Sequence, residues 1–397
     1  MTTMKAVEEA LKSFYLPGLR YQLNDKASAL LAQIEKSTEN VVGKDIVMAL
    51  RHGRVGGIGN RADDGTLPTP NARKTKQAKW ETKNLFARFQ ITDKTIQASK
   101  SSVGAFANML ETEISDCETD ARLDLSRQVL GDGKGTLATL AANSTYAAGP
   151  PKTLACVVDS AMYLAEGMLV DVRASNNTLA TGAIGVEVVS VDEATNTVSI
   201  AVESDVSGNV LEDAYFTVAG NYNLEVTGVG AVLATTGELY GLDKAVFTWL
   251  KPQVRALNGE ISDGAIQQQI DLAESRTGST INFLQCSLGV RRAYIDLLSA
   301  NKQSVNTLDL KGGWKAISYN GIPLAGDRYI KTGELHLFDL NDWTMYQMAD
   351  YDWLDMDGSM FTRVANKAAW EATLAKYCDI GCQRPRGQAL ISGITEH

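Results

Sequence analysis

Apolar residues recur every three or four positions in one long stretch, which is the spacing of a single helix face. The series runs from Val103 to Val129 and predicts an amphipathic helix of nearly 30 residues, about 43 Å long at 1.5 Å per residue. Ser101 and Ser102 can cap its start, and the glycines of residues 131–135 end it. Such a helix must run across a whole domain as a spine.

The residues before this helix have a different pattern. Apolar and polar residues alternate from Leu85 to Thr92, which is the period of a strand with two distinct faces. A segment rich in Gly and Arg begins at Arg51, and a turn cluster occupies residues 63–71. We interpret residues 51–92 as a long projecting hairpin whose returning strand is the alternating stretch. Residues 1–50 predict an arm with a break at Pro17-Gly18 and a short helix, whose apolar contacts are Leu30, Leu31 and Ile34.

After Pro150-Pro151 the pattern changes to short apolar segments separated by turns rich in Asn, Asp and Gly. Their spacing predicts a small β-barrel or sandwich inserted at residues 154–222. The predicted strands are residues 156–158, 168–172, 186–191, 197–202 and 215–218.

Residues from 240 onward show a mixed α/β pattern. A helix centred on Ile266 leads into a strand at residues 280–284, and Ser287 can cap a following helix. Asn320-Gly321 between apolar residues is the strongest hairpin signal in the chain. Further strands are expected at residues 335–340 and 370–377.

Charge is segregated along the chain. Residues 51–88 carry a net charge of +6 within a total of −9, whereas residues 174–243 contain ten acidic residues and no Lys or Arg. Surfaces of opposite sign are therefore expected to meet between copies of the chain or with a partner. The basic residues, which we take as candidate contacts between subunits, are Arg51, Arg54, Arg61, Arg73, Lys74, Lys76, Lys79, Lys83 and Arg88.

Catalytic and cofactor motifs are absent from the sequence. Gly131-x-Gly-x-Gly135 closes a helix, whereas a phosphate-binding loop opens one. The three histidines, His52, His336 and His397, lie beside no Cys or second His, and the five cysteines are scattered and odd in number. Asp355-Met-Asp357-Gly358 lacks the further ligands of a calcium loop. We expect no enzyme activity, no cofactor and no metal, and no stretch is long and apolar enough to span a membrane.

The order of these parts resembles the major capsid (coat) proteins of tailed double-stranded DNA bacteriophages. The resemblance covers nearly the whole chain and rests on the order of several short motifs, each of them weak alone. The motifs are Phe89-Gln-Ile-Thr-Asp93, Gly104-Ala-Phe106, Arg127-Gln-Val-Leu-Gly-Asp-Gly133, Gly289-Val-Arg-Arg-Ala-Tyr-Ile-Asp-Leu-Leu298, Asn320-Gly-Ile-Pro-Leu324, Trp353-Leu-Asp-Met-Asp-Gly358 and Cys382-Gln-Arg-Pro-Arg-Gly387.

The resemblance implies an α+β tailed-phage coat fold with an inserted β module. Its expected parts are an N-terminal arm at 1–50, an extended hairpin loop at 51–92, a peripheral domain with the spine helix at 93–150, the module at 154–222, an axial domain at 240–355, and return strands of the peripheral domain at 356–397. In this family the hairpin reaches over a neighbouring subunit.

The resemblance also implies a function. Pentamers and hexamers of the chain would form an icosahedral head around double-stranded DNA, assembled in the host cytoplasm with a scaffolding protein, a portal and, in some members, a decoration protein. Contact with DNA should be weak and non-specific, because the subunit is acidic overall. We expect no maturation cleavage and no Lys–Asn crosslink, although Lys74, Lys76 and Lys79 are placed near the loop tip.

Two alternatives remain open at this point. An encapsulin-type compartment would use the same fold around cargo proteins, and a β-rich phage tail or adhesin component is disfavoured by the spine helix. The acidic module is either a solubilising insertion, which we favour slightly, or an outward-facing decoration or lattice-clamping domain.

Overall fold

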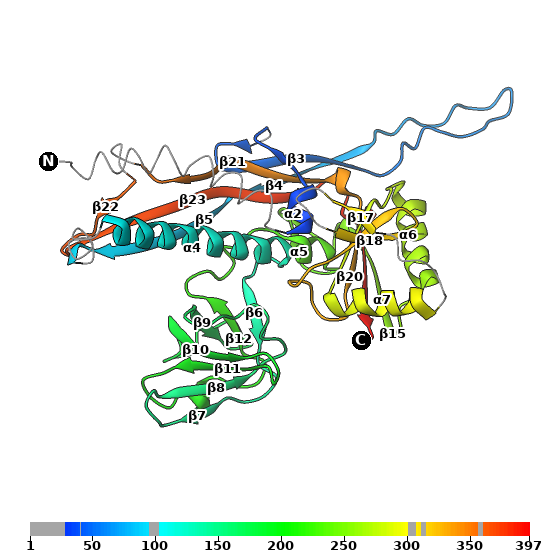
Figure 1. Ribbon diagram of the computed structural model, residues 1–397. Coiled ribbons are helices and arrows are strands. Elements are labelled where there is room, and N and C mark those ends of the chain that lie inside the picture. The colour runs from blue at the N-terminus through cyan, green and yellow to red at the C-terminus, as the bar shows by residue number, and fades with distance from the viewer. Residues whose placement is uncertain (1–27, 40, 95–102, 301–306, 311–314, 356–359) are drawn as a thin grey trace.

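The computed structural model describes four connected parts, which Figure 1 shows side by side. A sheet carries the long helix α4 along one face, a hairpin projects from one end of this sheet, a barrel lies on the α4 side, and a second sheet flanked by helices completes the chain. The described residues are 28–39, 41–94, 103–300, 307–310, 315–355 and 360–397.

The first sheet, here called the peripheral sheet, is antiparallel along its long strands. β5 pairs with β23 over ten residues, from Thr92 opposite Ala369 to Lys83 opposite Cys378. Leu85 and Ile91 of β5 are buried while Phe86 is exposed, which confirms the predicted alternation. The five strands are β1 (Glu35–Ser37), β5 (Lys83–Thr92), β21 (Trp343–Trp353), β22 (Thr362–Arg363) and β23 (Ala369–Cys382).

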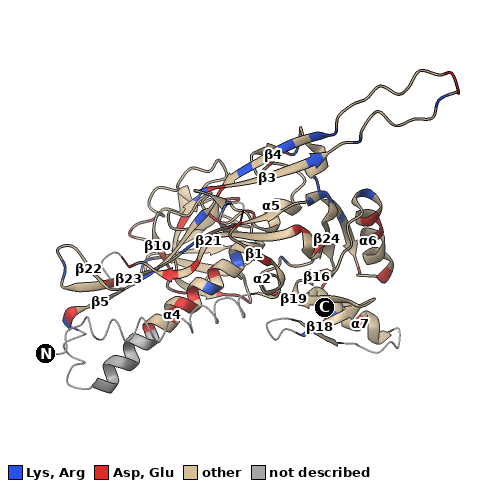
Figure 2. Cartoon of the chain, turned by 90° about the horizontal axis from the view of Figure 1, so that it is seen from above, with Lys and Arg blue, Asp and Glu red and all other residues tan. Residues whose placement is uncertain are grey.

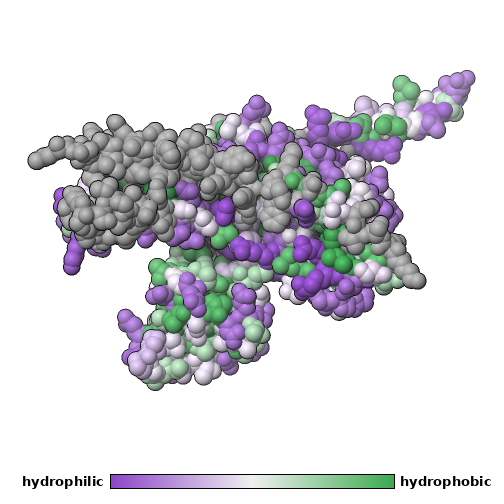
Figure 3. Space-filling view, in the orientation of Figure 1, coloured by the Kyte–Doolittle hydropathy of each residue, from purple (hydrophilic) through white to green (hydrophobic). Residues whose placement is uncertain are grey.

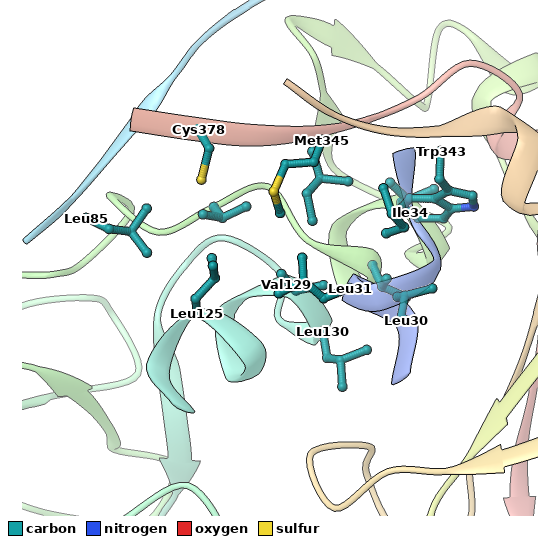
Figure 4. Close-up of a cluster of buried hydrophobic side chains, with 14 of the residues drawn as sticks. Leu30, Leu31, Ile34, Leu85, Leu125, Val129, Leu130, Trp343, Met345 and Cys378 are labelled. Atoms are coloured by element: carbon teal, nitrogen blue, oxygen red, sulfur yellow. The ribbon is translucent and has the colours of Figure 1, made fainter. Parts of the chain in front are cut away.

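Helix α4 (Val103–Leu130) confirms the predicted spine helix. Its apolar face, including Leu125 and Val129, is buried against the peripheral sheet and the short helix α2 (Ala29–Gln33), as Figure 4 shows. α4 ends where Gly131 N–H bonds back to the carbonyls of Arg127 and Gln128, and Gly133 then adopts a φ of 83°. The predicted capping serines at 101 and 102 lie outside the described residues.

The hairpin consists of β3 (Asp45–His52) and β4 (Lys74–Glu81), with β2 (Val41–Val42) beside β3. β3 and β4 pair from Asp45 opposite Glu81 to His52 opposite Lys74. Residues 53–73 form no strand and project far from the rest of the chain (Figure 1). The prediction that Leu85 to Thr92 returns from the hairpin was wrong, because β4 is the returning strand and β5 belongs to the peripheral sheet.

The β module is a barrel with a hydrophobic core of its own. Its strands follow the order β6-β12-β9-β10-β11-β8-β7, and a bridge between Leu140 and Val158 joins the ends of β6 and β8 and closes the barrel. The first two strands precede residue 154, so the predicted start of the module was too late. The strands are β6 (Thr136–Thr139), β7 (Thr145–Ala147), β8 (Thr153–Val157), β9 (Leu169–Arg173), β10 (Val186–Asp192), β11 (Thr197–Ala201) and β12 (Tyr215–Val218).

A second sheet, here called the axial sheet, has helices α6 (Asp263–Thr277) and α7 (Leu288–Ala300) beside it. The predicted Asn320-Gly321 turn is confirmed, since both residues have positive φ and the strands on either side of them pair. The strand order is β15 (Gln253–Gly259), β24 (Ala389–Ile394), β20 (Leu335–Phe338), β16 (Phe283–Cys286), β19 (Ile322–Gly326), β18 (Lys315–Tyr319) and β17 (Thr307–Asp309).

Two strands lie in a different sheet from the one that the sequence predicted. β21 falls within residues 240–355 but pairs with β23 of the peripheral sheet, and β24 falls within 356–397 but pairs with β15 and β20 of the axial sheet. The chain therefore crosses between the sheets three times. These crossings contain the short helical turns η2 (Thr248–Leu250), η4 (Leu340–Asp342) and η5 (Pro385–Gly387).

A buried polar network holds the last two crossings together. The side-chain oxygen of Gln388 accepts hydrogen bonds from Asp339 N and from Trp343 Nε1, both at 3.0 Å, while its nitrogen donates to Asp342. Arg384 Nε donates to Asp342 at 2.8 Å. The run Cys382-Gln-Arg-Pro-Arg-Gly387 thus has a structural role, because it carries the chain from the peripheral to the axial sheet.

Candidate assembly surface

The base of the hairpin is fixed to the body of the chain by aromatic stacking. Trp80 of β4 stacks on Tyr240 with ring centroids 4.1 Å apart, and His52 of β3 stacks on Trp249 at 4.8 Å. The hydroxyl of Tyr240 also accepts a hydrogen bond from Cys382 N at 2.9 Å. The hairpin therefore leaves the body in a set direction, although its outer part has no support.

The tip of the hairpin combines exposed apolar side chains with the charged residues Arg61, Asp63 and Asp64, and Figure 3 shows hydrophobic and hydrophilic residues side by side along the hairpin. Ile58 and Leu67 are 67% and 82% exposed, which are high values for large hydrophobic residues in a polar, Gly-rich segment. The Arg61 side chain is hydrogen-bonded within the tip, since its guanidinium donates to the carbonyls of Asn60 and Thr66. Exposed apolar groups of this kind are expected to be covered by another molecule.

Seven of the nine predicted contact residues lie on the hairpin, and Figure 2 marks Lys and Arg positions in blue along β3 and β4. Lys74, Lys76 and Lys79 lie on strand β4, so the expectation that they stand near the tip was wrong. Lys79 pairs with Asp45 at 2.8 Å, and Lys76 lies 5.5 Å from the ring centroid of Phe247. The seven are Arg51, Arg54, Arg61, Arg73, Lys74, Lys76 and Lys79.

The other two predicted contact residues, Lys83 and Arg88, lie on β5 of the peripheral sheet. Lys83 Nζ donates to Asn223 O at 3.4 Å, and Arg88 forms an ion pair with Glu371 of β23. Both side chains thus have partners within their own chain. Sequence reasoning grouped them with the hairpin because it assigned β5 to the wrong partner strand.

Sequence reasoning missed the aromatic contacts at the base. Trp249 and Tyr240 are more than 150 residues from His52 and Trp80 in sequence, so no local pattern links them. The two apolar residues of the tip could have been found, because large hydrophobic residues are unusual in a turn-rich basic segment.

Acidic side chains gather on other parts of the chain. The barrel residues 136–222 include ten acidic residues and only two basic ones, and the described part of α4 carries several more. On α4, burial raises the pKa of Glu118 to about 7, and burial together with Asp116 raises the pKa of Asp120. The outer part of the hairpin extends away from α4 and from the barrel (Figure 1), so it meets neither acidic surface within the described chain.

The histidines lie apart from one another and serve different local contacts. His336 is buried, with Nε2 3.1 Å from a carboxylate oxygen of Glu334, and His397 lies 2.9 Å from Glu260, which raises the pKa of His397. In the described ranges, no group of three or more His, Cys, Asp or Glu side chains is placed to hold a metal ion. No described helix is long and apolar enough to cross a membrane.

A hollow of about 250 Å³ lies between β5, α4 and the end of the barrel. Asp124 is its only acidic lining residue, and this carboxylate already accepts hydrogen bonds from Arg127 and Gln128. The lining includes no His or Cys. Tyr351 of β21 is the other titratable residue of the lining.

Comparison with solved structures identifies the fold of this chain. No family model and no curated protein sequence matches the chain. The capsid subunit of cyanophage A-1(L) matches over 95% of this chain and 93% of that one, with 10% identity and a TM-score of 0.55. The procapsid of satellite phage P4 matches over 96% and 99%, with 12% identity and a TM-score of 0.43. An encapsulin of Synechococcus elongatus matches over 36% and 55%, with 15% identity and a TM-score of 0.29.

At such low identity, only the likeness in fold carries weight, and it spans nearly the whole of both chains in the cyanophage comparison. The chain therefore has the coat-protein fold of tailed-phage capsids.

Proposed function

We propose that this chain is the major capsid protein of a tailed double-stranded DNA phage and has a structural rather than an enzymatic role. Copies of it would associate as pentamers and hexamers and close into the icosahedral head of the virion. The observation that carries the proposal is the outer part of the hairpin, residues 53–73, which the other described residues leave largely uncovered (Figure 1). The fold that bears it is shared with a capsid subunit along nearly its full length.

The physical argument concerns what the hairpin lacks within one chain. Residues 53–73 form no strand, and Ile58 and Leu67 at the tip are largely exposed. A second copy would cover these side chains, and its acidic surface would complement the basic residues of the hairpin. Because each copy both gives and receives a hairpin, modest energies at each contact would add up to a stable shell.

The same proposal implies further partners for the chain. Assembly would use a scaffolding protein and a portal, and a decoration protein could bind the finished shell. The enclosed DNA would make weak, non-specific contacts, because the subunit carries a net charge of −9.

The test is assembly of the purified full chain, followed by sedimentation and negative-stain microscopy. Closed polyhedra of uniform size are expected, and DNA or protein found inside particles from infected cells would separate a phage head from an encapsulin-type compartment. Persistent monomers or open tubes under all assembly conditions would contradict the proposal.

A hairpin deletion provides the matched variant. His52 and Lys74 are the last paired residues of β3 and β4, so residues 53–73 can be replaced by an Asn-Gly turn without loss of strand pairing. We expect this variant to fold with the same unfolding midpoint as the full chain and to form no shells. Normal shells from it would remove the hairpin from its proposed role.

A further inference from the structure

The barrel is attached to the peripheral part by a buried ion pair. The chain enters the barrel just after α4 and returns just before α5 (Val229–Leu233), so both connections pass the C-terminal end of α4. There the guanidinium of Arg127 forms a two-pronged pair with Glu225, with nitrogen–oxygen distances of 2.5 and 3.0 Å, and Asp124 accepts two further bonds from it. Burial opposes the charge of Arg127, but Asp124 and Glu225 outweigh it and hold its pKa above the ordinary value.

The segment that returns from the barrel to α5 packs so closely against the C-terminal end of α4 that it leaves no space for a side chain. A Cβ atom on Gly228 would lie 2.5 Å from the carbonyl oxygens of Gln128, Val129 and Gly131, which only a glycine avoids. The preceding residue, Thr227, donates its backbone N–H and its hydroxyl to Asp379 of β23, at 2.6 and 3.0 Å. The root of the barrel is thus fixed to both α4 and the peripheral sheet.

A second contact joins the barrel to the axial part. The hydroxyl of Tyr163, from the loop between β8 and β9, donates a hydrogen bond to the backbone carbonyl of Tyr329. The two rings stack with centroids 5.9 Å apart, and the guanidinium of Arg328 lies 4.6 Å from the Tyr329 ring centroid. Tyr329 is itself held, because its N–H donates to Asp327, whose other oxygen accepts from Gln285 of β16.

The peripheral and axial sheets already share one hydrophobic core, and we propose that the barrel is an intramolecular brace that acts together with this core to fix the angle between them. It is anchored to one of them through Arg127, Glu225 and Thr227 and to the other through Tyr163. An insertion that only adds solubility needs neither anchor, since domains joined by small polar contacts move relative to each other by default. The brace differs from a lattice clamp, because both of its anchors lie within one chain.

The consequence for a shell rests on the proposed function. The angle between the two sheets sets how neighbouring copies tilt toward each other, so a brace on this angle narrows the range of shell curvature. Loss of the Tyr163 contact would widen that range without removing any contact between copies.

The first experiment uses the unassembled full chain, so that its outcome does not depend on shell formation. All five cysteines are buried, so Thr362→Cys on β22 of the peripheral sheet and Ser275→Cys on α6, both at exposed positions, provide two accessible sites for spin labels. Pulsed electron spin resonance then gives the distribution of distances between the peripheral and axial parts. We expect a narrow distribution in this background and a broader, shifted one after Tyr163→Ala.

Two further variants control for folding. Tyr163→Phe keeps the ring stack and removes only the hydrogen bond, so it should broaden the distribution less than Tyr163→Ala. Tyr215→Phe removes a comparable hydrogen bond, from the Tyr215 hydroxyl to Asn177 at 2.8 Å, but within the barrel, and should leave the distribution unchanged. Amide exchange in residues 326–331 should be roughly tenfold faster in Tyr163→Ala and unaltered in Tyr215→Phe.

An unchanged distance distribution and unchanged amide exchange in Tyr163→Ala would overturn the brace, whatever the shells do. If neither the unsubstituted chain nor any variant forms shells, that result would instead contradict the proposed function. The brace would then still be tested by the measurements on the unassembled chain. If shells form, Tyr163→Ala should give a wider range of particle diameters than Tyr215→Phe.

Discussion

Reversal of charge on the returning strand of the hairpin is the sharpest test of the assembly surface. The change is Arg73→Glu, Lys74→Glu and Lys76→Glu together, which lowers the net charge of residues 51–88 from +6 to 0. All three side chains are exposed, and among the described residues the one side-chain contact of the group is that of Lys76 with Phe247. The free energy of unfolding should therefore change by only about 0.5 kcal/mol.

The effect on assembly follows from the electrostatics of exposed pairs. A solvent-exposed ion pair contributes about 0.2–1 kcal/mol, so loss of three such pairs costs about 1–3 kcal/mol at each hairpin contact. That energy corresponds to a roughly 5- to 150-fold weaker contact. Because every copy in a shell makes the contact, the critical concentration for assembly should rise beyond the working range.

The assay is light scattering during assembly over a series of protein and salt concentrations, with microscopy of the end points. Assembly of the unsubstituted chain should weaken as salt rises, because salt screens exposed charges. A neutral variant with Gln at residues 73, 74 and 76 should fall between the two. A further variant reverses three exposed lysines outside the hairpin, Lys152, Lys315 and Lys331, and controls for net charge. If the variant with Glu at residues 73, 74 and 76 gave a normal yield of shells with unaltered salt dependence, the proposed electrostatic contact of the hairpin would be refuted.

Three further predictions concern the stability of single chains in denaturant. Phe216→Ala, at a fully buried position of the barrel core, should cost about 3–5 kcal/mol and lower the first unfolding midpoint, whereas a single unshifted transition would contradict an independent barrel core. Arg127→Met should cost about 3–5 kcal/mol because it leaves Glu225 buried and unpaired, and adding Glu225→Met should restore much of the loss; no recovery would count against the pair. Burial raises the pKa of Asp379 to about 7, so the stability that this group contributes is present below about pH 4 and is lost as the pH rises through 7. Asp379→Asn should therefore reduce the fall of the urea unfolding midpoint between these two pH values. An unchanged fall would exclude Asp379 as its cause.

The elements with local signals were predictable. The apolar spacing of α4 and the glycines after it define a helix and its end, because both depend on residues within one or two turns. The Asn320-Gly321 turn was equally local, since the positive φ of both residues is a property of the dipeptide. The alternation in β5 identified a strand with one buried face.

The partners of the strands were not predictable in this way. Alternation shows that Leu85 to Thr92 is a strand, but the strand opposite is nearly 300 residues away in β23, so the hairpin boundary and two of the candidate contacts, Lys83 and Arg88, were misassigned. The same limitation placed β21 and β24 in the wrong sheets. The start of the barrel was missed because β6 and β7 are short and pair with strands from later in the chain.

The sequence by itself determined the elements with strong local patterns, the segregation of charge and the resemblance that predicted a capsid subunit. Only the tertiary structure decided which strands share a sheet, which basic residues project on the hairpin, and that Arg127 meets Glu225 and Tyr163 meets Tyr329. The physical reason is that helices and turns are stabilised by neighbours in sequence, whereas strand pairing and buried ion pairs join residues whose proximity depends on the path of the whole chain.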